Sequence, residues 1–363
     1  MTWSNQDVLW MTRALELAAR GRFTTWPNPM VGCVVVQHKL VLAEGWHRLH
    51  GEGHAEVNAL AQLDPALDLS QATAYVTLEP CSHTGKTPPC ADLLVTRGVG
   101  RVVVAMTDPN PMVAGRGIGR LQQSGATCDV GCLEHEARQL NAPFVHRMTS
   151  KTPWVTLKWA QSADGFMDGR TSPALGSGGW AITGSASARW THTLRAQHDT
   201  LLVGMRTWLV DNPSLTTRYA PGPSARALIL TQGRTARPES AKPASDWEVA
   251  PVLVHPDSGA SERALDTWRQ SGYETLALHP PPMTHEWWVD LCKELDCAAV
   301  LIEGGAQIAK LALSTSNWNE LHVLQSPKSL GKGLAAPKFP ESPSARRKRC
   351  GKDDVQIWER PVR

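Results

Sequence analysis

His54-Ala55-Glu56-Val57 opens the stretch that decides the fold of this chain, and Glu79-Pro80-Cys81 and Pro88-Pro89-Cys90 complete it. The stretch supplies one imidazole and two thiolates, which are good ligands for Zn²⁺. Three protein ligands leave one tetrahedral position for water, as in a catalytic zinc site rather than a closed structural one. Glu56 follows His54 closely enough to sit beside the metal without binding it. We predict a zinc site of His54, Cys81 and Cys90, with Glu56 as the group that moves protons.

The order of these residues is typical of one kind of zinc chemistry. Bound Zn²⁺ lowers the pKa of water toward about 7, so that hydroxide can attack a ring carbon that carries an exocyclic amine. His-x-Glu followed by Pro-Cys and a further Cys is the signature of zinc deaminases, although eight residues separate Cys81 from Cys90 here instead of the usual two. The alternative is a structural zinc site with His83 as its fourth ligand, but that site gives Glu56 no purpose.

Length and composition limit the classes of protein that fit. The 363 residues, of which 42% are hydrophobic, are enough for two globular domains. A net charge of +3 indicates neither a nucleic-acid nor a membrane surface, and no apolar run reaches the roughly 18 residues of a spanning helix. Met1 to Trp10 lack the pattern of a secretory signal. We therefore expect a cytoplasmic protein with reduced thiols, in which Cys128, Cys132, Cys292 and Cys297 are buried.

Strands alternate with helices in the first half, which predicts a layered α/β domain. A helix is expected from Ser4 to Arg20, where Ser4 and Asp7 resemble a capping box. Two further helices, His54 to Leu63 and Cys90 to Arg97, place metal ligands at helix starts, where the helix dipole favours thiolate. The expected strands are Val31–Gln37, Val41–Glu44, Ala74–Leu78, Arg101–Met106 and Ala126–Val130.

The pattern restarts near Lys151. A helix is expected from Ser185 to Gln197, and the expected strands are Trp154–Trp159, Thr200–Gly204, Ala227–Leu230, Val252–His255 and Ala299–Glu303. Glu303-Gly304-Gly305 then forms a turn before a helix, which can cradle a phosphate with backbone N–H groups, although a tight turn without a ligand fits equally well. The basic run Arg346 to Arg349 is expected to be a solvated loop.

Over nearly its whole length the chain resembles the bifunctional deaminase–reductases of riboflavin biosynthesis. The resemblance in the first half rests on long, ordered motifs: Pro27-Asn28-Pro29-Met30-Val31-Gly32, the stretch from Glu79 to Cys90, and Asp108-Pro109-Asn110-Pro111 with Val113 to Gly117. In the second half it rests on Leu157-Lys158, Ser162 with Asp164-Gly165, Leu194-Arg195-Ala196, Asp211 to Thr216 with Arg218, and Glu303-Gly304-Gly305.

The resemblance implies two domains and two consecutive reactions. Residues 1–148 would form a cytidine-deaminase-like, three-layer α/β/α domain that uses Zn²⁺ to deaminate a diaminopyrimidinone carrying a ribosylamino 5′-phosphate. Residues 152–363 would form a dihydrofolate-reductase-like α/β domain that reduces the ribose of the product to ribityl with NADPH. The family further implies a small pyrimidine ribotide as the partner, without nucleic acid or membrane, and a homo-oligomer that associates through the reductase domain.

The same resemblance assigns roles to residues of both halves. In the deaminase it implies that His54, Cys81 and Cys90 bind zinc, that Glu56 is catalytic, and that Asn28 hydrogen-bonds the pyrimidine. In the reductase it implies substrate-binding positions at Arg195, Leu215, Arg218 and Glu303, and cofactor-binding positions at Lys158, Ser162, Thr207, Asp211, Gly304 and Gly305.

Three other functions compete with this one. A tRNA-adenosine or cytosine deaminase would explain the zinc site but not the second half, and activity on an RNA hairpin would favour it. A zinc-stabilised binding module could contact RNA through Arg346 to Arg349; it would release no ammonia from any pyrimidine. A deaminase with a non-catalytic reductase half is the third, because Trp180 stands one residue earlier than the family pattern has it.

Overall fold

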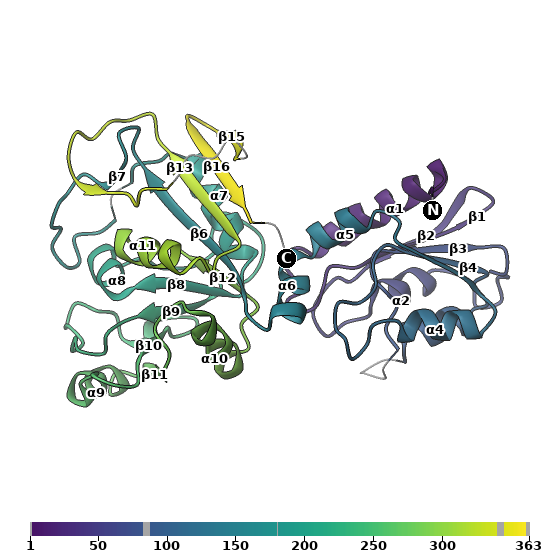
Figure 1. The fold of residues 1–363 in the computed structure, drawn as a ribbon, viewed down its shortest axis with the longest axis horizontal. Coiled ribbons are helices and arrows are strands. Elements are labelled where there is room, and N and C mark those ends of the chain that lie inside the picture. The colour runs from purple at the N-terminus through teal and green to yellow at the C-terminus, as the bar shows by residue number, and fades with distance from the viewer. Residues whose placement is uncertain (1, 83–87, 180, 340–344, 361–363) are drawn as a thin grey trace. The chain divides into compact units, whose positions relative to one another are not determined.

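The computed structural model describes residues 2–82, 88–179, 181–339 and 345–360 of the chain (Figure 1). They form two compact units, Met1–Ser150 and Lys151–Arg363. His83, considered above as a fourth zinc ligand, and Trp180 both lie outside the described residues. A search of the described residues finds no helix with the length and apolar character needed to cross a membrane.

The first unit is built on a five-stranded sheet with the strand order β2-β1-β3-β4-β5. The inner strand β1 pairs antiparallel with β2 and β3, and the sheet continues in parallel through β4 and β5. The strands are β1 (Gly32–Gln37), β2 (Leu40–Trp46), β3 (Thr73–Val76), β4 (Arg101–Val104) and β5 (Thr127–Val130). The helices are α1 (Asn5–Ala18), α2 (Ala55–Leu60), α3 (Cys90–Thr96), α4 (Arg116–Gln123), α5 (Glu134–Leu140) and α6 (Ala142–Ser150), with a short 3₁₀ helix η1 (Ala19–Gly21).

Alternate side chains of this sheet face two separate cores. Cys33 and Val35 of β1 pack with residues of α2, α3 and α4, whereas Val34 and Val36 pack with residues of α1, α5 and α6. This alternation is the two-residue period of a strand that is covered on both faces. The expected three-layer α/β/α domain is therefore confirmed, as is the first helix, where the Ser4 hydroxyl accepts a hydrogen bond from the Asp7 amide.

The second unit is built on a nine-stranded sheet with the order β11-β10-β9-β8-β12-β6-β13-β16-β15. All pairs from β11 to β13 are parallel, and β16 and β15 add an antiparallel edge. The strands are β6 (Trp154–Gln161), β8 (Thr200–Gly204), β9 (Arg226–Leu230), β10 (Val252–Pro256), β11 (Glu274–Leu278), β12 (Ala299–Ile302), β13 (Glu320–Gln325), β15 (Arg346–Cys350) and β16 (Asp353–Glu359), and β7 (Phe166–Asp168) pairs apart with β14 (Leu334–Ala335).

Helices cover both faces of the parallel part. Residues of α10 and α11 share a core with β6 and β12, and residues of α7, α8 and α9 share another with β8 and β9. The helices are α7 (Ser185–Ala196), α8 (Met205–Asp211), α9 (Glu262–Arg269), α10 (His285–Leu295) and α11 (Ala306–Thr315), with a 3₁₀ helix η2 (Ala244–Asp246). Parallel strands end at the same edge of a sheet, so the residues that follow β6, β8 and β12 are brought together there.

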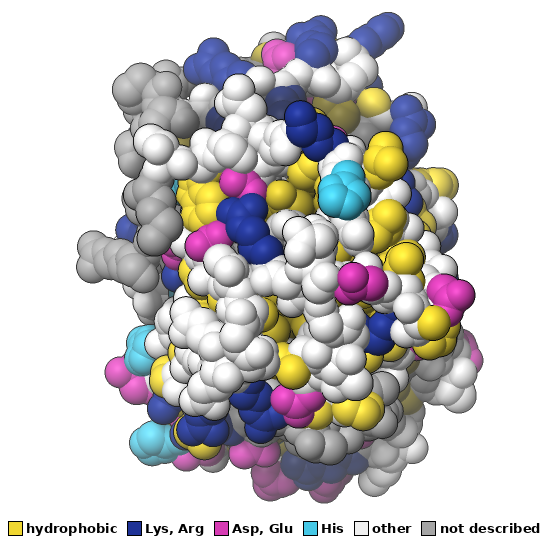
Figure 2. All heavy atoms as spheres, turned by 90° about the vertical axis from the view of Figure 1, so that its right-hand side faces the viewer, with side chains coloured by type: hydrophobic (Ala, Val, Ile, Leu, Met, Phe, Trp, Pro, Cys, Tyr) yellow, Lys and Arg dark blue, Asp and Glu magenta, His cyan; other side chains and the backbone are white. Residues whose placement is uncertain are grey.

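The prediction that the basic run forms a loop is wrong. Arg346 to Arg349 belong to β15, an edge strand that pairs with β16 and is not a loop. The charged side chains are exposed as expected, and Arg349 pairs with Asp354 at 2.9 Å. Backbone pairing with β16 forms the strand, while the row of charge on the free edge discourages pairing with another chain. On the face drawn in Figure 2, Lys and Arg side chains are interspersed with Asp and Glu.

Candidate metal centre and reductase site

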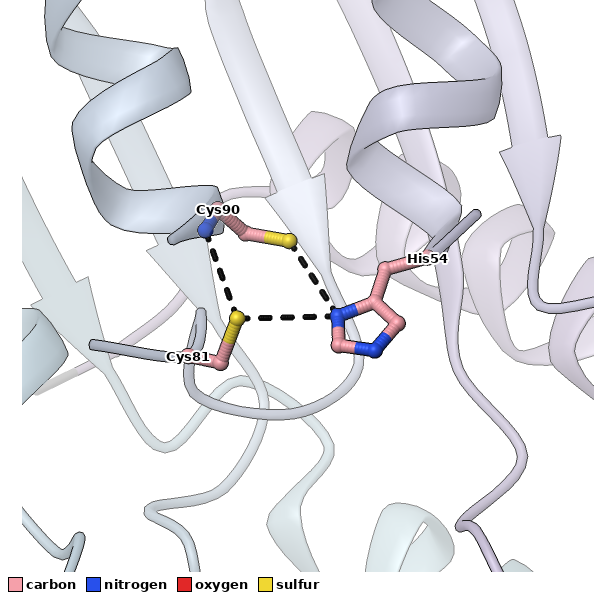
Figure 3. Close-up of side chains that lie close together, drawn as sticks. All are labelled: His54, Cys81 and Cys90. Carbon is pink, nitrogen blue, oxygen red and sulfur yellow. Dashed lines mark hydrogen bonds between the residues drawn. The ribbon is translucent and has the colours of Figure 1, made fainter. Parts of the chain in front are cut away.

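Three metal-ligating side chains meet on one side of the first sheet. His54 caps the start of α2, Cys81 follows β3, and Cys90 is the first residue of α3. His54 Nδ1 lies 3.5 Å from Cys81 Sγ and 3.3 Å from Cys90 Sγ (Figure 3). All three potential ligand atoms lie within 4.8 Å of one another. Tetrahedral zinc with bonds of about 2.0–2.3 Å separates nitrogen and sulfur ligands by about 3.5–3.8 Å, so the cluster has the size that Zn²⁺ requires.

The charge of this cluster also suits a divalent cation. Hydrogen bonds from the Cys90 thiol, His54 and the Cys90 amide lower the pKa of the Cys81 thiol, whereas the neighbouring Cys81 sulfur and burial raise the pKa of Cys90. Without a cation, a thiolate at Cys81 therefore opposes ionisation of Cys90. A metal ion that binds both as thiolates removes this conflict, so the residues present fit Zn²⁺.

Glu56 lies in the first turn of α2 and is only 3% exposed. Burial raises the pKa of Glu56 to about 7, and the Cys81 thiolate adds to the increase. The carboxyl group is close enough to Cys90 for a hydrogen bond, but it is not one of the clustered ligand atoms. This position beside the cluster is the one that the sequence predicted, and a pKa near neutrality suits proton transfer in both directions.

A buried histidine that sequence reasoning missed lies next to His54. The rings of His47 and His54 meet edge to face with their centres 5.5 Å apart. His47 Nδ1 is 3.2 Å from the Gly53 carbonyl, so Nδ1 donates there and Nε2 accepts from the Asn28 amide nitrogen at 3.1 Å. Asn28 therefore turns its nitrogen toward His47. The only signal in the sequence is a lone His after the strand, which is usually a core residue.

Two further side chains that sequence reasoning missed support this site. Asn141 is buried, and its side-chain amide accepts from the Met30 N–H and donates to the Met30 carbonyl, each at 2.8 Å. This clamp fixes the loop that carries Asn28. Buried Glu79 accepts hydrogen bonds at 2.9–3.3 Å from four backbone N–H groups, those of Asp108, Gly115, Gly117 and Ile118.

Glu79 thereby links two motifs that lie far apart in the sequence. Its carboxylate joins the segment before Cys81 to the loop after β4 and the start of α4. A Cβ at Gly117 would lie 1.9 Å from the Pro80 carbonyl oxygen, so this close approach requires glycine. The Asp-Pro-Asn-Pro and Gly115-Arg116-Gly117 motifs therefore hold the segment that leads into Cys81.

In the second unit, three of the predicted residues form a charged cluster at the carboxyl edge of the sheet. Glu303 follows β12 and pairs with Arg195 of α7 through two hydrogen bonds of 2.7 and 2.8 Å. Lys158 of β6 lies 3.9 Å from the same carboxylate. Despite burial, Arg195 and Lys158 lower the pKa of Glu303 to about 2. Burial lowers the pKa of Lys158, because the attraction of Glu303 offsets only part of the desolvation.

The substrate loop predicted after Asp211 packs against this cluster. Arg195 donates a further hydrogen bond of 3.0 Å to the Thr216 carbonyl. Leu215 is buried, with a positive φ of 52°. Arg218 is exposed, and its guanidinium lies against the Ser214 hydroxyl. The structure thus brings Arg195, Leu215, Glu303 and the backbone of Arg218 together.

The positions predicted for a cofactor lie beside this cluster. The Gly305 N–H donates to the Thr207 hydroxyl at 3.0 Å, and a Cβ at Gly304 or Gly305 would meet a neighbouring side chain at 2.6 Å. These contacts set the starts of α8 and α11 side by side, which suits a dinucleotide with a pyrophosphate. Asp211 ends α8, and its carboxylate lies 4.0 Å from Arg170.

Two of the predicted cofactor residues make other contacts. The Ser162 hydroxyl is buried, donates to Asp164 and accepts from the Phe166 amide, at 2.6 and 2.9 Å. The Asp164 carboxylate in turn accepts from the amides of Leu330 and Gly331, which orders the turn after β6. Lys158 lies with Glu303 in the charged cluster described above.

Known proteins resemble both units. Residues 4–106 match the cytidine and deoxycytidylate deaminase zinc-binding region, and residues 153–356 match the RibD C-terminal domain. The riboflavin biosynthesis protein RibD of Escherichia coli is 40% identical over 90% of this chain and 89% of its own length, and that of Aquifex aeolicus is 36% identical over 91% and 89%. The Acinetobacter baumannii RibD structure (form 1) superimposes with a TM-score of 0.81 at 34% identity, covering 97% of this chain and 98% of that one.

The fold and the two sites define a zinc-dependent deaminase joined to an NADPH-dependent reductase. A Thermotoga maritima protein described as a diaminohydroxyphosphoribosylaminopyrimidine deaminase/5-amino-6-(5-phosphoribosylamino)uracil reductase superimposes with a TM-score of 0.79 at 28% identity, over 98% of both chains. Because identity of 36–40% to RibD proteins extends over about nine tenths of the sequence, the chain belongs to the RibD family of riboflavin biosynthesis proteins.

Proposed function

We propose that this chain catalyses two consecutive steps of riboflavin biosynthesis. The first is the hydrolytic deamination of 2,5-diamino-6-ribosylamino-4(3H)-pyrimidinone 5′-phosphate, and the second is the NADPH-dependent reduction of the ribosyl group to ribityl. Residues 1–148 carry the deaminase, residues 152–363 carry the reductase, and the protein acts in the cytoplasm as a homo-oligomer that associates through the reductase domain. The two activities in the description of the Thermotoga maritima relative support the pair of reactions.

One observation carries the deaminase assignment: three ligand atoms from His54, Cys81 and Cys90 cluster within 4.8 Å, with the buried Glu56 beside them. Bound Zn²⁺ supplies hydroxide at neutral pH by lowering the pKa of water. Glu56 accepts a proton from the attacking water and gives it to the ring nitrogen; it then takes the proton of the new hydroxyl group and delivers it to the amine, which leaves as ammonia. Asn28 binds the pyrimidine edge, and His47 and the Met30 backbone contacts hold that amide in place.

In the reductase, NADPH supplies the hydride and the protein orients the ribotide. Arg195, Leu215, Arg218 and Glu303 bind the ribotide, and Lys158, Ser162, Thr207, Asp211, Gly304 and Gly305 hold the cofactor. The exposed guanidinium of Arg218 suits the substrate phosphate, which arginine binds through two hydrogen bonds. Arg195 is already paired with Glu303, so that pair orients the sugar rather than the phosphate.

A crossed experiment with two variants tests both assignments. Glu56→Gln is expected to keep zinc and fold but to lose at least about 10²-fold in ammonia release, because it removes the general acid–base group. It should still oxidise NADPH when the deaminated intermediate is supplied. Arg218→Ala is expected to release ammonia at the wild-type rate and to accumulate that intermediate, since it loses a charge-assisted contact of about 1.5–3 kcal/mol.

The outcomes separate the proposal from its alternatives. If Glu56→Gln also stops NADPH oxidation while the protein stays folded, the two-site assignment is wrong. If the wild-type protein releases ammonia but never oxidises NADPH, the second half is not a working reductase. If it deaminates an RNA hairpin and not the ribotide, the substrate class is wrong.

A further inference from the structure

His192 is a buried histidine of the reductase to which the functions above give no role. It lies on α7, one turn before Arg195, and is only 5% exposed. Its Nδ1 is 2.9 Å from the backbone nitrogen of Arg218, which can only donate. Nδ1 must therefore be the acceptor, so the ring is neutral and its proton is on Nε2.

The surroundings keep the ring in this form. Burial and the positive charges of Arg195, Arg218 and Lys158 lower the pKa of His192 to about 4, while Glu303 acts in the opposite direction. The edge of the ring also meets the ring of Tyr219, with the centres 4.7 Å apart. An imidazolium here would carry a proton on Nδ1, directed at the Arg218 N–H, and the hydrogen bond would be lost.

Besides the hydrogen bond to His192, two other contacts from outside the segment hold the backbone from Leu215 to Arg218. Arg195 holds the Thr216 carbonyl at 3.0 Å, and the Ser224 hydroxyl accepts from the Thr217 amide at 3.1 Å. The segment begins at Leu215, whose positive φ of 52° is unfavourable for a leucine and must be held by its neighbours. The exposed guanidinium of Arg218 contacts the hydroxyls of Ser214 and Thr216 in the same loop, so its direction depends on how this backbone is held.

We infer that His192 is a positioning residue of the reductase, whose Nδ1 fixes the Arg218 backbone and so aims the guanidinium at the substrate phosphate. This inference rests on the proposed role of Arg218. It predicts that His192 affects binding of the ribotide and not binding of NADPH or the deaminase reaction. The essential property is a neutral acceptor at the place of Nδ1.

Asparagine and glutamine variants separate this role from simple packing. The amide oxygen of Asn reaches the position of Nδ1 in a histidine, whereas Gln extends toward the position of Nε2. His192→Gln and His192→Ala are expected to raise the KM for the deaminated ribotide about five- to tenfold, as for one lost hydrogen bond. His192→Asn should stay within about threefold of the wild type, and no variant should change the KM for NADPH or the rate of ammonia release.

A double variant tests the path of the effect. If His192 acts through Arg218, then His192→Ala with Arg218→Ala should have the KM of Arg218→Ala alone. The inference would be overturned if the effects of the two substitutions on the KM for the ribotide multiply, if the KM values for the ribotide and for NADPH change equally, or if His192→Asn is as impaired as His192→Gln. If His192→Ala does not fold, the comparison of Asn with Gln still decides it. An unchanged KM for the ribotide in Arg218→Ala would instead refute the proposed role of Arg218 in binding the substrate phosphate. The comparison of His192→Asn with His192→Gln would then still show whether an acceptor at the position of Nδ1 matters.

Discussion

The metal centre and the charged cluster of the reductase hold buried charge in opposite ways. Around His54, the two thiols and Glu56 are acidic groups that no Lys or Arg of the described residues pairs with, and burial raises the pKa of Glu56 to about 7. Around Glu303, two cationic side chains already lie against the carboxylate and lower its pKa to about 2. The first site is completed by an ion that the protein must acquire, whereas the second is balanced by the fold itself. Loss of a metal-binding side chain should therefore abolish the activity of the first site, and loss of a charged side chain should lower the stability of the second unit.

Removing a thiolate is the change with the largest expected effect. Cys90→Ser should lose bound zinc and all measurable ammonia release, because a serine hydroxyl stays protonated and is a poor zinc ligand. NADPH oxidation with supplied intermediate should be unchanged. Metal content by atomic absorption, together with both activities, checks this expectation.

Cys128→Ser is the matched control for this variant. Cys128 is half-buried on β5 and is not one of the clustered ligands, so its variant should keep one zinc per chain. Full zinc occupancy in Cys90→Ser, or zinc loss in both variants, would show that the ligand set is wrong.

Removing the negative charge of Glu303 is the corresponding change in the second site. Glu303→Gln leaves Arg195 and Lys158 largely buried without a counter-charge, and breaking such a pair costs about 3–5 kcal/mol. Urea unfolding followed at a probe in the second unit should show this loss, while zinc content and ammonia release are kept. A variant as stable as the wild type would mean that water or another group compensates these charges.

The same pair gives the second site a defined dependence on pH. The pKa of Glu303 falls from 4.5 in the unfolded chain to about 2 in the folded one, so its contribution is complete above pH 4.5 and disappears as the pH falls toward 2. The shift corresponds to about 3 kcal/mol. The stability difference between wild type and Glu303→Gln should therefore shrink over this interval. A difference that stays constant would contradict the assigned cause.

The two sites also differ in how much of them the sequence reveals. The cluster of His54, Cys81 and Cys90 and the neighbouring Glu56 could be predicted because they stand in short motifs, with all but Cys81 at a helix start. Arg195 and Glu303 were found only through the family resemblance, because their pairing joins residues 108 positions apart in the sequence. Glu79 and Asn141 hold backbone groups of distant loops, and His47 holds the side chain of Asn28, which no local pattern marks. No helix was predicted at α8, and Arg346 to Arg349 were taken for a loop because strand pairing by β16 is a tertiary effect.

The smallest expected effect concerns Asn141, which supports the metal centre without charge. Asn141→Ala removes two hydrogen bonds to Met30, each worth about 0.5–1.5 kcal/mol, so the first unit should lose about 1–3 kcal/mol. Ammonia release should fall several-fold because the loop of Asn28 loosens, yet zinc and NADPH oxidation should be kept.

Gln62 offers the control, because its exposed amide also contacts two carbonyls, at 2.6 Å. Water can replace the amide there, so Gln62→Ala should change the free energy of unfolding by less than about 0.5 kcal/mol. Equal effects of the two variants on ammonia release would mean that burial of the clamp is irrelevant. Loss of zinc in Asn141→Ala would mean instead that the Asn28 loop and the ligand cluster form one cooperative unit. The fold of the first unit would then contribute to zinc binding, and the two sites would differ only in how their buried charges are balanced.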